Sequence, residues 1–162
     1  MIPIPASFPS KLITREYQSP AVSEEVRKLL RQTDQHFEQT ASASKDELYQ
    51  SINEIRSECL AANWNGEGAK AVSKDAVEEA LLFARGLASF LPIPHVAPTA
   101  TGAIAFEWRG RGRRALIATV AGRREIDFAI SIDRSLRLNG SFAFADSVPP
   151  QVEEWLNEYF RA

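Results

Sequence analysis

The chain contains few of the residues that build catalytic and metal sites. Its 162 residues include one cysteine, Cys59, and two histidines, His36 and His95. A lone cysteine excludes an internal disulfide, and no ligand spacing of the zinc type is present. No glycine-rich phosphate loop follows a strand pattern, and there is no nucleophile elbow. We therefore expect no catalytic residue, no metal and no cofactor, and we interpret Cys59 and both histidines as structural.

Long apolar runs are also missing. No stretch approaches the roughly 18–20 apolar residues that span a bilayer. The segment Met1–Pro5 lacks a basic region followed by a long apolar one, so we expect no secretory signal. The content of 44% hydrophobic and 25% charged residues is ordinary for a globular domain. These observations predict a cytoplasmic protein with no membrane association.

Prolines are concentrated at the N-terminus, where residues 1–20 hold four of the nine. They disfavour a regular helix and favour an extended path. The same segment carries apolar residues such as Ile2, Ile4 and Phe8, which argue against a freely solvated tail. We predict an extended arm over residues 1–20 and a single domain over 21–162. The arm packs either on its own domain or on a partner, and the second alternative includes a homodimer.

Apolar residues recur at helical spacing in four segments. Ser19 and Pro20 open the first, Ser44 and Glu47 form a capping box for the second, and Ser73 caps the third. The predicted helices cover residues 20–40, 45–62, 74–91 and 149–161.

The period changes to two in the second half of the chain. Four strands are predicted, at about 103–109, 114–121, 125–133 and 137–144. Their short links indicate an antiparallel meander. The fold class is therefore α+β, with three N-terminal helices, a four-stranded meander and a C-terminal helix packed on one sheet face. For the second strand the buried set is either Leu116, Ala118 and Val120 or the opposite set with Ile117.

The segment Asn63–Lys70 combines an aromatic side chain, two glycines, two amides and a charge pair between two helical patterns. One interpretation is a structural corner, in which a glycine ends the helix at Asn63 and Trp64 anchors the loop. The other interpretation is a recognition loop that uses Trp64, Asn65, Glu67 and Lys70.

Charge is unevenly distributed along the chain. Residues 101–145 carry eight arginines against four acids, and residues 21–62 carry eight acids against five bases. Two predicted hairpins hold most of these arginines: Arg109, Arg111, Arg113 and Arg114 in one, and Arg123 and Arg124 in the other. In a meander they lie at opposite ends of the sheet. Each is either an edge-protecting turn, a site for an acidic protein, or a site for nucleic acid.

The acids of the first two predicted helices could form an acidic face that covers a basic groove of another protein. Its candidate members are Glu24, Glu25, Asp34, Glu38, Asp46, Glu47, Glu54 and Glu58. Adjacent pairs such as Glu78–Glu79 and Glu153–Glu154 are interpreted as solvated helix faces.

Several short segments occur in a distinctive order: Trp64–Ala69, Val72–Ser73, Leu91–Pro98 and Gly102–Trp108. Over roughly residues 60–135 the chain resembles a family of small bacterial proteins without an assigned reaction. The resemblance implies a shared domain and no catalytic residue.

The sequence thus predicts a non-catalytic bacterial protein that binds a larger protein or complex. Antitoxins, immunity and defence-accessory proteins, and anti-defence inhibitors such as those of CRISPR effectors belong to this class. The alternative is a nucleic-acid-binding module that uses the arginine hairpins. An enzyme of unknown reaction is the third hypothesis.

Overall fold

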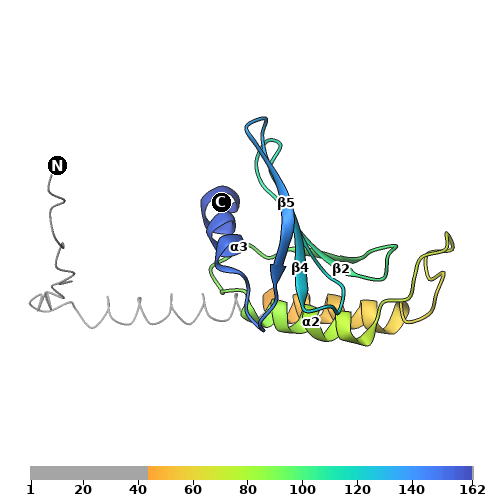
Figure 1. Ribbon diagram of the computed structural model, residues 1–162. Coiled ribbons are helices and arrows are strands. Elements are labelled where there is room, and N and C mark those ends of the chain that lie inside the picture. The colour runs from red at the N-terminus through yellow and green to blue at the C-terminus, as the bar shows by residue number, and fades with distance from the viewer. Residues whose placement is uncertain (1–43, 162) are drawn as a thin grey trace, which may run out of the picture. The chain divides into compact units, whose positions relative to one another are not determined.

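The computed structural model describes residues 44–161, so the predicted arm at 1–20 and helix at 20–40 lie outside the described residues. Residues 44–58 are helical. None of the helices in this part of the chain is both long and apolar enough to cross a membrane. The elements that follow are α2 (Lys74–Gly86), β1 (His95–Pro98), β2 (Ile104–Arg109), β3 (Ala115–Val120), β4 (Glu125–Ile132), β5 (Leu136–Ala143), α3 (Pro150–Trp155) and the π-helical turn η1 (Leu156–Phe160) (Figure 1).

The strands form one antiparallel sheet in the order β1-β2-β3-β4-β5. The predicted α+β class and antiparallel meander are confirmed, but the sheet has five strands and not four. The additional strand is β1, where His95 lies opposite Glu107 and Pro98 lies opposite Ile104. Its prolines hide the strand pattern in the sequence. Proline is nevertheless compatible with an edge strand, because the missing N–H can face away from the neighbouring strand.

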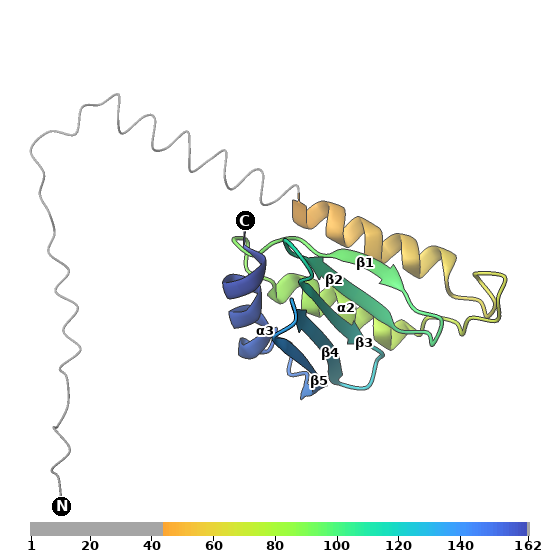
Figure 2. The same cartoon turned by 90° about the horizontal axis from the view of Figure 1, so that it is seen from above.

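One face of the sheet forms the core. Leu116, Ala118 and Val120 are buried on it, whereas Ile117 is 36% exposed on the opposite face. Of the two interpretations of this strand, the first is therefore correct. Phe83 of α2 packs against the same face, with its ring 4.6 Å from that of Phe106. Figures 1 and 2 show α2 and the helix at 44–58 on this one side of the sheet.

The C-terminal helix covers the β4–β5 part of the core face. The ring of Trp155 lies 5.1 Å from that of Phe128, which in turn stacks on Phe142 at 4.8 Å. After Trp155 the backbone changes from α-helical to π-helical, and Leu156 and Phe160 are both buried. The predicted apolar stripe of this helix thus packs on the core.

Two predicted helices extended too far. The second ends at residue 58 and not at 62, because the carbonyl of Cys59 accepts a hydrogen bond from the N–H of Val72. The third ends at Gly86 and not at 91, because Leu87 turns to an extended conformation. Leu87 and Leu91 are nevertheless buried, so the apolar pattern correctly predicts burial but not helix length.

The Glu79 side chain is the one buried charged group among the described residues, with 4% exposure. The interpretation of Glu78–Glu79 as a solvated pair is therefore wrong for Glu79. Its carboxylate accepts hydrogen bonds from the backbone N–H of Gly122 at 2.8 Å and of Arg124 at 2.5 Å. Both donors belong to the β3–β4 turn, where a Cβ on Gly122 would lie 2.8 Å from the nitrogen of Ala76. The carboxylate thus joins α2 to one end of the sheet.

We expect Glu79→Ala to lower the free energy of unfolding by about 1–3 kcal/mol, because it leaves two part-buried N–H donors without an acceptor. Glu79→Gln retains one acceptor oxygen and should cost less. Urea denaturation followed by circular dichroism measures the difference. Glu78→Ala is the matched control, since Glu78 is exposed one residue away, and it should change stability by no more than about 0.5 kcal/mol. Equal losses for Glu79→Ala and Glu78→Ala would contradict the role of Glu79.

Cys59 is 4% exposed and lies in the core beside the helix end. Burial, with a smaller contribution from the charge of Glu58, raises the pKa of its thiol. A raised pKa lowers the thiolate fraction at every pH below it, and the thiolate is the reactive form. We expect an aromatic disulfide reagent at pH 8 to react with the folded protein at least about tenfold more slowly than with the chain in guanidinium. Equal rates in the two conditions would show that Cys59 is accessible.

Candidate binding site at the arginine-rich end of the sheet

The loop at residues 63–70 is organised by its own hydrogen bonds. Asn63 adopts a positive φ of 61°, and its N–H donates to the carbonyl of Ala69. The side-chain oxygen of Asn65 accepts from the N–H groups of Glu67 and Ala69. Trp64 donates from Nε1 to the carbonyl of Lys70 at 3.0 Å and packs partly buried against the core. These contacts use Trp64 and Asn65 to hold the loop together, and they leave the side chains of Glu67 and Lys70 exposed.

Trp64→Ala should lower the free energy of unfolding by about 2–3 kcal/mol, somewhat less than a fully buried tryptophan would cost. Thermal or urea unfolding of the purified variant measures this loss. Glu67→Ala, in the same loop but exposed, serves as the control and should be nearly neutral. If Trp64→Ala were as stable as Glu67→Ala, the ring would not anchor the loop.

The arginines of the β3–β4 turn have partners within the protein. Arg124 forms an ion pair with Asp146 at 2.7 Å and lies over the ring of Phe144. The hydrogen bond to Asp146 raises the pKa of Arg124 above its ordinary value. Arg123 pairs with Asp127 at 3.2 Å. This basic tip is therefore largely neutralised by its own acids.

The opposite end of the sheet has a larger excess of positive charge. We call it the arginine end and define it by Arg109, Arg111, Arg113, Arg114 and Arg161, which lie on the β2–β3 hairpin and next to η1. Two acids are paired there: Glu107 lies 2.7 Å from Arg109, and Asp133 lies 3.5 Å from Arg114. Among the described residues, the side chains of Arg111 and Arg113 make no ion pair. They are the guanidinium groups most available to an external anion.

The C-terminal segment packs beside this hairpin. Arg114 donates from a terminal nitrogen to the carbonyl of Tyr159 at 3.4 Å. A Cβ on Gly110 would lie 3.3 Å from both that carbonyl oxygen and the Phe160 ring, so glycine permits the close approach. A side-chain hydrogen bond with Glu158 raises the pKa of the Tyr159 hydroxyl. Between hairpin and C-terminal segment lies a pocket of about 320 Å³ lined by Arg109, Gly110, Arg111, Arg114, Tyr159, Phe160 and Arg161.

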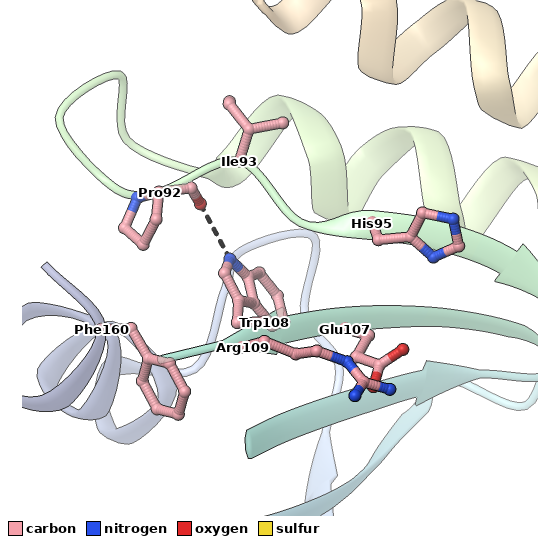
Figure 3. Close-up of a pocket in the computed structure, with 7 residues that line it drawn as sticks. All are labelled: Pro92, Ile93, His95, Glu107, Trp108, Arg109 and Phe160. Carbon is pink, nitrogen blue, oxygen red and sulfur yellow. Dashed lines mark hydrogen bonds and ion pairs between the residues drawn. The ribbon is translucent and has the colours of Figure 1, made fainter. Parts of the chain in front are cut away.

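A second pocket of about 480 Å³ adjoins the first and shares Arg109 and Phe160 with it (Figure 3). Its remaining lining residues are Pro92, Ile93, His95, Glu107 and Trp108. Trp108 is fixed by a hydrogen bond of 2.8 Å from Nε1 to the carbonyl of Pro92. Its ring and that of Phe160 are 2% and 7% exposed, and Ile93 is 40% exposed. The second pocket thus combines an apolar wall, whose accessible part is mainly Ile93, with the charged pair Glu107–Arg109.

Together the two pockets place guanidinium groups next to an apolar surface. Guanidinium groups bind carboxylates or phosphates through paired hydrogen bonds. The apolar wall suits an aliphatic or aromatic side chain. Within residues 44–161 no group of three His, Cys, Asp or Glu side chains could hold a metal ion.

The sequence predicted four of the five arginines that define this end, but it missed the C-terminal contribution. Arg161, Phe160 and Trp108 come together only through the packing of η1 on the sheet end. The predicted strands began only at residue 103, and this is corrected for His95, which opens β1 and lines a pocket.

Only half of the acids of the predicted acidic face lie within the described residues. Asp46, Glu47, Glu54 and Glu58 are exposed on the helix at 44–58. The remaining four, Glu24, Glu25, Asp34 and Glu38, lie outside the described residues. A continuous acidic face therefore stays a prediction.

No protein-family model, curated protein or solved structure matches the chain. The resemblance to small bacterial proteins without an assigned reaction also stays a prediction.

Proposed function

We propose that the protein is a non-catalytic binding protein whose arginine end binds an acidic segment of a larger protein. The observation that carries this proposal is the pairing of two adjoining pockets, one lined by four arginines and one with an apolar wall. An inhibitory, immunity or defence role, as the sequence suggested, stays a prediction.

Charge supports an acidic occupant. The pocket of about 320 Å³ contains no carboxylate among its lining residues, while it contains Arg109, Arg111, Arg114 and Arg161. Each of these arginines presents donors in a planar fork that matches a carboxylate. Because Arg111 makes no ion pair among the described residues, binding an acid there displaces no internal partner.

The apolar wall supports a protein segment more than a nucleic acid. Bound single strands stack their bases on exposed aromatic rings, whereas Trp108 and Phe160 are almost fully buried. Phe90 is 52% exposed, and the guanidinium of Arg161 lies over one face of its ring, 5.7 Å from the ring centre. An apolar side chain flanked by Asp or Glu fits both pockets without a stacking platform.

The double variant Arg111→Glu/Arg113→Glu tests the proposal. Co-purification of the tagged chain from its native host should recover a protein in stoichiometric amount. We expect the double variant to lose that protein, with an affinity at least about tenfold lower, because a hydrogen bond to a charged group is worth about 1.5–3 kcal/mol. Arg123→Glu/Arg124→Glu provides the matched charge change at the opposite end and should retain the protein. Failure to recover any stoichiometric protein over a series of salt concentrations would contradict the proposal.

The second candidate function is binding to nucleic acid, which the cluster of arginines at one end favours. It predicts that the logarithm of the binding constant falls linearly with the logarithm of the salt concentration, because binding releases counterions from the nucleic acid. An electrophoretic mobility shift with labelled duplex and single-stranded DNA and RNA distinguishes the two candidates. A shift at low salt that disappears in Arg111→Glu/Arg113→Glu would favour nucleic acid, and no shift of the wild type would remove this candidate.

A further inference from the structure

The two edges of the sheet differ in how they are protected against further strand pairing. Edge strands expose unpaired N–H and C=O groups that another strand can join. At one edge, β1 is four residues long and ends at Pro98, which has no N–H to donate. At the other edge, β5 is eight residues long, contains no proline and carries one charge, Arg137. Within residues 44–161, β5 is therefore the edge better suited to pairing.

The exposure of β5 agrees with this assignment. All five residues from Arg137 to Ser141 are exposed. Among them Leu138 is 46% exposed. In the register with β4, Leu138 lies opposite the buried Ile130, so its side chain is on the core face but lacks a neighbour beyond the edge.

The hydrogen-bond pattern between β4 and β5 shows which backbone groups of β5 point away from β4. The N–H of Phe144 donates to the carbonyl of Arg124 at 2.8 Å, which continues the register in which Ala143 lies opposite Glu125. In an antiparallel pair only alternate residues exchange hydrogen bonds with one neighbour. Even-numbered residues of β5 therefore bond to β4, and the N–H and C=O groups of Arg137, Asn139 and Ser141 point outward.

We propose that β5 pairs with β5 of a second copy of this chain, antiparallel and about a two-fold axis at Asn139. Asn139 then lies opposite Asn139 of the second copy, and Arg137 lies opposite Ser141 of the second copy. All of these residues present outward-pointing backbone groups, so each pair exchanges hydrogen bonds in both directions. The same surface serves both copies, as a two-fold interface requires. The two sheets become one continuous sheet.

The side chains are complementary in this register. Leu138 comes to lie opposite Gly140 of the second copy. Gly140 has no side chain, and a Cβ there would lie 3.1 Å from the ring of Phe128. The exposed leucine of one copy can thus extend toward the Phe128 ring of the other across the glycine.

Charge is complementary on the opposite face. Asp127 lies opposite Ser141 within one chain, and its Oδ1 accepts a hydrogen bond from the Ser141 hydroxyl at 2.5 Å, while its Oδ2 pairs with Arg123. Pairing places Arg137 beside Ser141 of the second copy and therefore one strand away from the Asp127 carboxylate of that copy. This contact would favour the two-fold register at Asn139 over a slip along the edge.

Sedimentation velocity of the full chain over a concentration series tests the proposal. The wild type should shift from the mass of one chain to twice that mass. Asn139→Pro removes an outward N–H and leaves the ladder to β4 intact, and proline is tolerated on an edge with its nitrogen facing solvent. We expect it to weaken dimerisation at least about tenfold, while Asn139→Ala, which keeps the N–H, dimerises like the wild type. A wild type that stays monomeric, or an Asn139→Pro variant that still dimerises, would overturn the proposal.

Hydrogen exchange of the wild type provides a second measurement that needs no variant. The amides of Arg137, Asn139 and Ser141 should gain protection as the concentration rises, whereas those of Leu138 and Gly140 are already protected by β4. Dimerisation without this alternating protection would place the interface elsewhere, for example at the N-terminal arm, and would also overturn the proposal. Neither result depends on the arginine end, so the two proposals stand or fall separately.

Discussion

The Glu79 carboxylate sets the position of the main core helix relative to the sheet. It accepts hydrogen bonds from two backbone N–H groups of the β3–β4 turn, and the missing side chain of Gly122 lets that turn lie against the start of α2. With this end fixed, Phe83 is placed over Phe106 and Trp108. Trp108 in turn forms a wall of the larger pocket at the other end of β2. The position of the arginine end therefore depends on a series of packing contacts, and the first of them is the Glu79 hydrogen bonds.

The parts of the fold that depend on local pattern could be predicted from the sequence. The four longer strands alternate clearly, and their limits agree with the structure to within about one residue at most ends. β1 could not be recognised because prolines obscure a four-residue pattern, and its pairing with β2 is a tertiary contact. Glu79 looked like any acid on a helix surface, since nothing local indicates that a turn more than 40 residues away supplies its donors.

The candidate site shows the same division. Arginines that share a hairpin with glycines are evident from the sequence, and the meander places the two tips at opposite ends. The sequence does not show that the two hairpins differ in net charge, because the difference arises from ion pairs with acids on other parts of the chain. Asp146 lies 22 residues from Arg124 and pairs with it closely, whereas Arg111 has no ion-pair partner among the described residues. The contribution of Arg161 and Phe160 depends on how the C-terminal segment packs on the sheet end, where Leu156 and Phe160 are both buried, and this tertiary contact has no local sequence signal.

The position of η1 has a practical consequence for the design of expression tags and fusions. The chain leaves the described fold at Arg161, a lining residue of the arginine pocket. Anything joined there, whether a purification tag, a fluorescent protein or a further domain of a longer polypeptide, starts at the mouth of that pocket. If the arginine end binds an acidic segment, as we propose, a short acidic tag at this point competes with that segment, because a tethered ligand has a high effective concentration. An acidic sequence joined at Arg161 would thus occupy the pocket and block the proposed binding.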